Sequence, residues 1–387
     1  MKIAYITYPS FVDCDLPLIR SLREAGHDVR YYLVLTPYHC HSTLVDIKHL
    51  SPEYRILDGN AYPELLPYDR YIDLSTLRIV NFGGNNKFRI LFLWEKLRKD
   101  IKRFSPDIVH FTQFLPPYGF PLYYSFRGKL VATVHDPIPH LGEEYWWNEK
   151  LRRVGLKHVS SLCFLSNNET QNKAFLNRYG VPERIIHYAG LAPYDIYRVV
   201  QRNDTKYESD FLFIGRISPY KGIDILLQAK DILREKGIHC KLIVAGAGQL
   251  PENSKFYAQR DDIEIINRYI SVSELIAMID DTNYVVCPYK EATQSGVIMT
   301  ALALGRPVIA TRVGDFESVI TNNVNGFLTE ANNPEALAEV MEKSLEPSNI
   351  MQITAALSRQ SALTAWQDIA QQYVAIYNLT IQNRKRK

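Results

Sequence analysis

The chain has 387 residues, of which 46% are hydrophobic and 22% are charged, and its formal net charge is +3. This length predicts two domains, because a single ordinary core seldom grows so large. The small net charge excludes wholesale nucleic-acid binding, and no apolar run is long enough for a transmembrane helix. We therefore expect a globular cytoplasmic protein that contacts a membrane only from its inner surface, if at all.

The five cysteines are scattered along the chain and are odd in number, which is typical of reduced, buried thiols rather than a disulfide framework. They are Cys14, Cys40, Cys163, Cys240 and Cys287. No CxxC or HExxH pattern is present, so the sequence predicts no metal site. The opening MKIAYITYPSF predicts a strand and not a signal peptide, because its apolar run is short and is broken by Pro9.

The first 195 residues alternate between strand-like and helix-like segments, which indicates a doubly wound α/β domain. The expected strands are 2–7, 27–35, 107–111, 130–134 and 162–166, and the expected helices are 16–25, 87–104 and 169–179. Between residues 36 and 80 the pattern favours nothing finer than short strands and loops. The loop 8–15 has no glycine and is therefore not a dinucleotide fingerprint.

The expected helix 87–104 is amphipathic and strongly basic, with seven Lys or Arg residues against Glu95 and Asp100. Such a helix can lie on an anionic membrane. It can equally pack its apolar stripe on a core and expose a solvated basic face. We favour the second interpretation, because a long α/β domain needs core-facing helices.

His135 follows directly after the expected strand 130–134. The carboxyl ends of parallel strands form the edge at which α/β sheets bind ligands, so His135 is a candidate site residue. A purely structural role is about equally well supported by the sequence.

Residues 196–210 are polar and irregular and predict a linker, and a second α/β domain is expected over 211–363. Its expected strands are 211–214, 241–245, 263–266, 284–287 and 308–310, and its expected helices are 224–236, 273–279, 297–304 and 334–345. A last helix from residue 364 is expected to pack back on the first domain, and the basic tail 384–387 is expected to be disordered.

Two loops of the second domain have the chemistry of a phosphate site. GRISPYKG brings Arg216 and Lys221 between a strand and a helix, where two cations can hold a diphosphate. Thr293, Ser295 and Gly296 lie where the helix 297–304 begins, and helix N-termini favour phosphate. Taken singly, each loop is also compatible with solvated cations or an ordinary capped helix.

The segments FLFIGRISPYKGIDILLQA, IVAGAG, PYKEATQSGVIMTALALGRPVIATRVGDFESVI and NNVNGFL together resemble a family 4 glycosyltransferase of the GT-B fold. The resemblance covers nearly all of the C-terminal half, and the N-terminal half resembles the family more loosely through VATVHD. It implies two Rossmann-like domains that face each other across a cleft. It also implies a nucleotide-sugar donor held mainly by the second domain, retention of anomeric configuration and no metal or other cofactor.

The resemblance assigns roles to particular residues. Arg216 and Lys221 match the diphosphate-binding pair, Gly296 and Val297 match the helix start that completes it, and His135 matches the histidine that approaches the reacting sugar. Glu291 corresponds to the first of two family glutamates, whereas the second falls near Met299 or Thr300 and is absent. The further candidates for contact with the donor sugar or nucleotide are Thr293, Gln294, Ser295, Gly215, Gly246, Tyr269 and Ile270.

These features predict an enzyme that moves a sugar from a nucleoside diphosphate to a carbohydrate or lipid-linked glycan acceptor, in the synthesis of a bacterial surface polysaccharide. Two alternatives stay open. A nucleotide-sugar 2-epimerase shares the fold but needs a pair of acid/base carboxylates, which the sequence does not place. A non-catalytic partner subunit would tolerate the absent glutamate, but the presence of both Arg216 and Lys221 argues against it.

Overall fold

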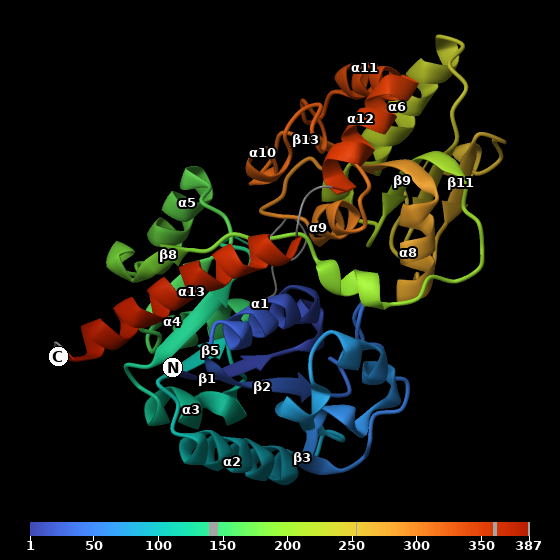
Figure 1. The fold of residues 1–387 in the computed structure, drawn as a ribbon. Coiled ribbons are helices and arrows are strands. Elements are labelled where there is room, and N and C mark those ends of the chain that lie inside the picture. The colour runs from blue at the N-terminus through green and yellow to red at the C-terminus, as the bar shows by residue number, and fades with distance from the viewer. Residues whose placement is uncertain (139–145, 253, 359–361, 386–387) are drawn as a thin grey trace. The chain divides into compact units, whose positions relative to one another are not determined.

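A computed structural model describes residues 1–138, 146–252, 254–358 and 362–385 (Figure 1). The chain forms two compact units. Unit 1 comprises Met1–Ala192 with Leu363–Lys387, and unit 2 comprises Pro193–Ala362. Each unit is built on a sheet of mainly parallel strands with helices in the connections, which confirms the predicted α/β class. No helix among the described residues is both long and apolar enough to cross a membrane.

The described part of unit 1 contains one eight-stranded sheet, in the order β3-β4-β2-β1-β5-β6-β7-β8. Its strands are β1 (Lys2–Thr7), β2 (Asp28–Leu35), β3 (Tyr54–Asp58), β4 (Leu77–Phe82), β5 (Ile108–Phe111), β6 (Leu130–Val134), β7 (Ser161–Phe164) and β8 (Ile186–Tyr188). Only β3 pairs antiparallel, with β4, among these strands. The strands are joined mostly by helices, as parallel pairing requires.

The helices of unit 1 cover the two faces of this sheet. They are α1 (Val12–Glu24), α2 (Lys87–Phe104), α3 (Phe120–Ser125), α4 (Trp146–Leu156), α5 (Glu169–Tyr179) and α13 (Ala362–Lys385). Side chains alternate along each strand. On β1, Ala4 and Ile6 belong to the hydrophobic cluster that contains residues of α2, α3 and α5. Tyr5 points to the other face, where its hydroxyl donates to Asp15 of α1 at 2.7 Å.

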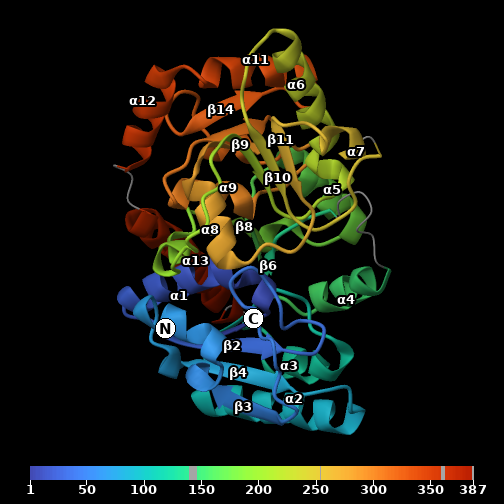
Figure 2. The ribbon, with the colours of Figure 1, turned by 90° about the vertical axis from the view of Figure 1, so that its right-hand side faces the viewer.

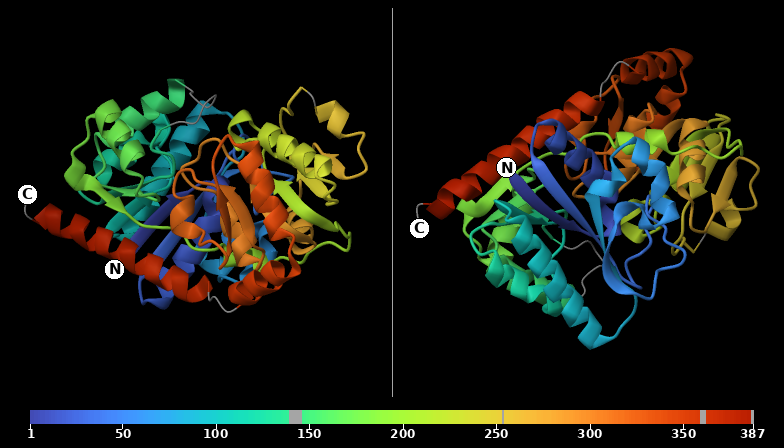
Figure 3. Two further views of the ribbon diagram at one scale, coloured as in Figure 1. Left: turned by 90° about the horizontal axis from the view of Figure 1, so that it is seen from above. Right: turned by 60° about the horizontal axis from the view of Figure 1, so that its bottom comes forward.

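Helix α13 is the long red helix that ends near the C-terminus in Figure 3, and buried polar contacts anchor it to the rest of unit 1. The Tyr377 hydroxyl lies 2.7 Å from His110 Nδ1 of β5, and Thr380 Oγ1 lies 2.7 Å from Ser161 Oγ of β7. The expectation of a disordered tail from Arg384 is wrong, because α13 continues to Lys385. The aliphatic part of Arg384 packs over Gly128, and residues 386–387 lie outside the described part.

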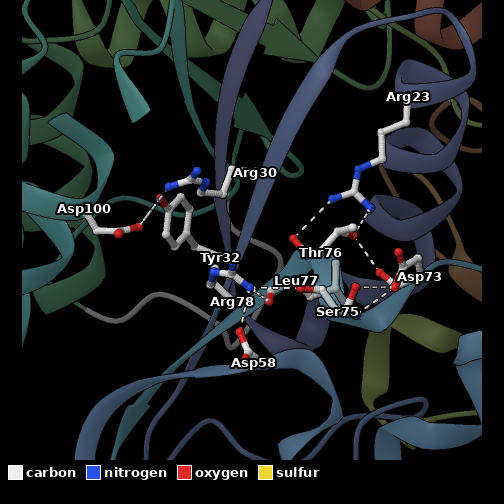
Figure 4. Close-up of polar contacts among 10 residues, drawn as sticks. All are labelled: Arg23, Arg30, Tyr32, Asp58, Asp73, Ser75, Thr76, Leu77, Arg78 and Asp100. Carbon is white, nitrogen blue, oxygen red and sulfur yellow. Dashed lines mark hydrogen bonds and ion pairs between the residues drawn. The ribbon is translucent and has the colours of Figure 1, made fainter. Parts of the chain in front are cut away.

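The region 36–80, for which the sequence favoured nothing definite, contains β3, β4 and three short 3-10 helices. Polar side chains in this region and on the elements beside it form hydrogen bonds between neighbouring elements, as Figure 4 shows. Arg78 of β4 donates to Asp58 of β3 at 2.7 Å, and the Tyr32 hydroxyl of β2 donates to Asp100 of α2 at 2.7 Å. These contacts join segments that are distant in the sequence and give no periodic signal.

The sheet of unit 2 has six parallel strands within the described residues, in the order β11-β10-β9-β12-β13-β14 (Figure 2). These are β9 (Ser209–Ile214), β10 (Leu242–Ala245), β11 (Ile263–Ile266), β12 (Thr282–Cys287), β13 (Val308–Thr311) and β14 (Gly326–Thr329). The helices are α6 (Ile223–Glu235), α7 (Ser254–Tyr257), α8 (Val272–Asp280), α9 (Gly296–Ala303), α10 (Phe316–Val319), α11 (Pro334–Ser344) and α12 (Pro347–Ser358). The strand order reverses between β9 and β12. This is the position where open α/β sheets bind ligands.

The start of the expected linker 196–210, together with the residues just before it, packs against α9. A short 3-10 helix occupies Asp195–Val199. The backbone N–H of Tyr194 donates to the carbonyl of Met299 at 3.1 Å, and Arg198 donates to the carbonyl of Ala303 at 2.5 Å. The chain therefore enters unit 2 along the helix whose N-terminus is a candidate phosphate site.

His110 generates a prediction about stability and pH. Its imidazole is fully buried, with Tyr377 and Thr133 each 2.7 Å away, and burial together with nearby His135 lowers its pKa to about 3. A folded-state pKa below the ordinary 6.5 means that the unfolded chain binds the proton more readily. The stabilisation is therefore complete above pH 6.5 and is lost progressively as the pH falls toward 3.

We expect His110→Gln to flatten the acid side of the melting-temperature profile. One extra proton bound by the unfolded chain lowers the free energy of unfolding by about 1.4 kcal/mol per pH unit. Between pH 6 and pH 4 the wild-type melting temperature should therefore fall about 2 °C more per pH unit than that of the variant. Exposed His49→Gln is the matched control and should keep the wild-type slope. Parallel profiles for all three proteins would contradict a neutral buried His110.

Candidate functional site

The candidate site of unit 2 lies at the carboxyl ends of the neighbouring strands β9 and β12. The loop 215–222 leaves β9 and enters α6, and the loop 288–295 leaves β12 and enters α9. Because the two strands are parallel and adjacent, both loops emerge at the same edge of the sheet. They emerge at the reversal in strand order.

The two loops are held against each other through their backbones. The N–H of Lys290 donates to the carbonyl of Tyr220 at 2.7 Å, and the Lys290 ammonium pairs with Asp224 at 2.7 Å. Gly222 has φ +68°, and a Cβ on it would lie 2.0 Å from the carbonyl oxygen of Pro288. A side chain at residue 222 would force the loops apart, so this contact requires glycine.

Lys221 places a buried positive charge between these loops. The residue is only 9% exposed, and its ammonium donates to the Tyr289 hydroxyl at 3.1 Å and lies 4.9 Å from the centre of the Tyr289 ring. A Cβ built on Gly215 would lie 3.3 Å from Lys221 Nζ and 3.3 Å from Val297 Cγ2. Glycine at residue 215 therefore allows the end of β9, the ammonium and the start of α9 to lie close together.

The N-terminus of α9 supplies hydrogen-bond donors close to this ammonium. The first N–H groups of a helix have no partner within the helix. Ser295 caps the helix by accepting from the N–H of Ile298 at 3.4 Å, and its own hydroxyl lies 3.4 Å from that of Tyr289. Gly296 and Val297 then begin the helix with the positive end of its dipole. An anion placed here would interact with both the ammonium and the helix N-terminus.

Two buried hydroxyls of the same loops have no protein partner in the described part of the chain. These are Thr293 Oγ1 and Ser218 Oγ. Thr293 is 1% exposed, and its backbone carbonyl accepts from the N–H of Asp315 at 3.0 Å, so its position is fixed. A buried hydroxyl without a partner costs free energy, which a ligand with polar atoms would recover.

The structure places the other predicted residues of the two loops as follows. Arg216 is exposed and donates to the Tyr220 hydroxyl at 3.4 Å, while Glu291 and Gln294 are half-buried in the loop 288–295. Gly246 follows β10, and a Cβ on it would lie 1.9 Å from the carbonyl of Gly215.

Tyr269 and Ile270 are not brought to the loops in this way. They follow β11, which lies two strands from β9. Tyr269 is half exposed, whereas Ile270 is buried in the hydrophobic core of unit 2. The structure thus gives the Ile270 side chain a packing role.

The position of the absent second glutamate is occupied by helix-internal contacts. Met299 and Thr300 are both 3% exposed, and Thr300 Oγ1 donates to the carbonyl of Gly296 at 2.9 Å. Neither side chain carries a carboxylate, and both are almost fully buried. Ribose recognition in this chain therefore requires other residues.

Sequence reasoning missed Tyr289 and Ser218. Tyr289 is 2% exposed, and burial, with a smaller contribution from Cys287, raises the pKa of its phenol well above the ordinary value. It is therefore a neutral hydroxyl that accepts from both Lys221 and Ser295. The sequence does show that Tyr289 follows Pro288 directly, in the loop between the strand and Glu291.

His135 belongs to unit 1, where it follows β6 as predicted. Its ring stacks on Phe11, with 4.0 Å between ring centres and 21° between planes. Burial lowers its pKa to about 4, against a smaller opposing effect of Asp136, so the imidazole is neutral near pH 7. Together with Asp15, Thr133 and Trp366 it lines a small cavity in unit 1. Burial raises the Asp15 pKa to about 8.

Known families match both halves of the chain. The family model described as "Glycosyltransferase Family 4" matches residues 16–188, and the model described as "Glycosyl transferases group 1" matches residues 208–346. An uncharacterized glycosyltransferase of Methanocaldococcus jannaschii is 31% identical over 150 residues, which are 37% of this chain and 41% of that protein. The chain thus spans about two fifths of that relative.

A phosphatidyl-myo-inositol mannosyltransferase of Propionibacterium freudenreichii is 25% identical over 374 residues, which are 94% of this chain and 89% of that protein. The crystal structure of HepE from Anabaena in complex with UDP-glucose aligns with a TM-score of 0.62, at 16% identity, over 97% of this chain and 100% of that one. This structural likeness shows the GT-B fold. With both halves matched in order, the chain belongs to the family 4 glycosyltransferases.

Proposed function

We propose that this glycosyltransferase moves a sugar from a nucleoside diphosphate to a hydroxyl of a carbohydrate or lipid-linked glycan. One observation carries the proposal: the buried Lys221 ammonium lies close to the N-terminus of α9, an approach that Gly215 permits. A leaving diphosphate needs stabilisation of negative charge as it develops, and preorganised donors supply it most effectively. The likeness to a protein crystallised with UDP-glucose supports a donor of this class.

The proposed reaction retains the configuration at the anomeric carbon. The bond between that carbon and the diphosphate oxygen breaks, and the acceptor oxygen bonds to the same face of the sugar. The acceptor proton passes to an oxygen of the leaving diphosphate. Lys221, Arg216 and the first N–H groups of α9 stabilise the diphosphate, and Thr293 and Glu291 are assigned to the donor sugar. No protein nucleophile takes part.

We propose that the reaction needs no metal ion or other cofactor. Lys221 and Arg216 carry full positive charges, and the α9 N-terminus adds a partial one. These charges perform the neutralisation that a divalent ion performs in other phosphoryl-handling sites. The described residues contain no group of three or more His, Cys, Asp or Glu that could hold a metal.

The proposal assigns His135 to the transferred sugar. A neutral imidazole, which its lowered pKa provides, can donate a hydrogen bond to a sugar hydroxyl without adding charge. The stacked Phe11 ring fixes the plane of the imidazole.

We place the reaction in surface polysaccharide synthesis at the inner face of the membrane. The similarity to a protein named for mannosyl transfer to phosphatidyl-myo-inositol supports an acceptor of lipid-linked type. The five cysteines, all buried and free, are compatible with a reducing compartment. The partners required are thus the nucleotide-sugar and the glycan acceptor.

The charge-neutralising role is tested by Lys221→Met and Arg216→Gln, which remove the charge and keep an unbranched aliphatic stem. Each should lower kcat/KM by about two to three orders of magnitude, the scale for losing one charge-stabilising group. Exposed Lys255→Met is the control and should be unaffected. The measurement is release of nucleotide from a panel of nucleotide-sugars. Near-normal turnover in Lys221→Met would remove the ammonium from the mechanism.

The same panel discriminates between functions. A transferase releases nucleoside diphosphate as the acceptor is glycosylated, a 2-epimerase forms an epimeric product, and a non-catalytic subunit does neither.

The role of His135 is tested by His135→Gln. Because the nucleotide is assigned to unit 2, this change should lower kcat by at least about tenfold and leave the dissociation constant of the nucleoside diphosphate unchanged. Both constants and the melting temperature should be measured on one preparation. A lower melting temperature with unchanged kcat per folded molecule would instead show a structural histidine.

A further inference from the structure

Helix α2 exposes large apolar side chains to solvent along one face. Phe88 is 86% exposed, Phe92 is 62% exposed and Leu91 is 50% exposed. All three lie in the first two turns of the helix, where residues three and four apart share one face. Contiguous apolar surface of this kind is uncommon on a soluble protein and marks an interaction surface.

The orientation of α2 is fixed by its opposite face. Leu93, Trp94 and Leu97 are at most 3% exposed and belong to the hydrophobic cluster beneath the sheet of unit 1. The core-facing interpretation of the sequence is therefore correct for this half of the helix. It does not account for the aromatic residues on the outer half.

The outer half of α2 is also strongly cationic. Its exposed basic residues are Lys87, Arg89, Lys96, Lys99, Lys102 and Arg103. The acidic residues of the helix are already neutralised. Glu95 forms an ion pair with Arg98, and Asp100 accepts from Tyr32 and pairs with Arg30 at 3.5 Å (Figure 4). The exposed side chains thus present net positive charge with aromatic rings among them.

Strand β3 adds a shallow hollow beside this face. The hollow is lined by Glu53, Tyr54, Arg55, Phe88, Arg89, Phe92 and Lys96. The Arg89 guanidinium lies 5.7 Å from the centre of the Tyr54 ring, and Glu53 is paired with Arg55 at 3.1 Å. Arg89 and Lys96 therefore border a hollow whose charge suits a phosphate headgroup.

We propose that the α2 face docks on an anionic phospholipid bilayer. The α2 face comprises the exposed residues among 87–103 and the hollow at β3. Phe88 and Phe92 insert among the headgroups, and the Lys and Arg side chains bind lipid phosphates. The charge of the face favours an anionic partner, and its inserted aromatic rings suit the membrane interface. This inference rests on the proposed function and extends it, because docking would bring the enzyme to the surface that carries a lipid-linked acceptor. Binding to lipid can be measured without any turnover.

The test is co-sedimentation of the full chain with vesicles of phosphatidylcholine containing 30% phosphatidylglycerol, as an order-of-magnitude anionic content for an inner membrane. We expect binding at low salt that weakens as salt is added, because screening shortens the reach of the charges. Vesicles of phosphatidylcholine alone should bind about tenfold more weakly or not at all.

Three sets of substitutions separate the contributions. Lys96→Gln with Lys99→Gln and Arg103→Gln should weaken binding at least about tenfold and reduce its salt dependence. Phe88→Ser with Phe92→Ser should weaken binding about tenfold at every salt concentration, because insertion is apolar. The control removes three exposed charges elsewhere, by Lys157→Gln, Lys206→Gln and Lys255→Gln, and should bind as the wild type does.

Failure of the inference is distinguishable from failure of the proposed function. Both sets of α2-face variants should keep wild-type hydrolysis of the soluble nucleotide-sugar, since none of these residues is assigned to the site. Absence of vesicle binding at low salt, or equal loss in the control, would overturn the inference. Self-association that disappears in the Phe88→Ser, Phe92→Ser variant, without vesicle binding, would overturn it in favour of a second copy of the chain.

Discussion

The organisation of unit 2 depends on keeping one ammonium buried at the edge of its sheet. Lys221 is 9% exposed, and removing a charge from water is costly unless something compensates for it. The Tyr289 hydroxyl and ring are among the groups that compensate for it. We propose that an anionic ligand binds at this edge, because the same edge carries a helix N-terminus and two buried hydroxyls.

Glycine makes this arrangement possible. The loops of β9 and β12 approach so closely that a Cβ at Gly222 would overlap the Pro288 carbonyl, and a side chain at Gly215 would fill the space beside Lys221. The backbone hydrogen bond from Lys290 to Tyr220 then fixes the distance between the loops. Contacts within unit 2 thus position both loops without a ligand, as electrostatic preorganisation requires.

Four of the segments expected from the sequence have the limits that the structure gives them. Residues 2–7, 87–104, 130–134 and 169–179 coincide with β1, α2, β6 and α5. The region 36–80 was not predictable, because its 3-10 helices and its edge strand β3 are held by tertiary contacts such as that of Arg78 with Asp58. The continuation of α13 through Arg384 was missed for the same reason, since packing on Gly128 has no local signal.

The candidate site was predictable only in part. Arg216, Lys221 and Ser295 follow from the rule that ligands bind where parallel strands end. Tyr289 and Ser218 could not be found in this way. Their loops are about 70 residues apart in the sequence, and only the strand order brings them together. Tyr289 then contacts Lys221 of the other loop, whereas the Ser218 hydroxyl is buried without a partner among the described residues. Likewise, the periodicity of α2 predicted its buried stripe but not which of its remaining aromatic residues stay exposed.

The most direct measurement is titration calorimetry of UDP, GDP and ADP into the protein in the presence of EDTA. If protein cations hold the diphosphate, at least one nucleotide should bind with EDTA present, and Lys221→Met should weaken it about a hundredfold. Binding that requires magnesium or manganese, or equal affinity of the wild type and Lys221→Met, would contradict this account of the site.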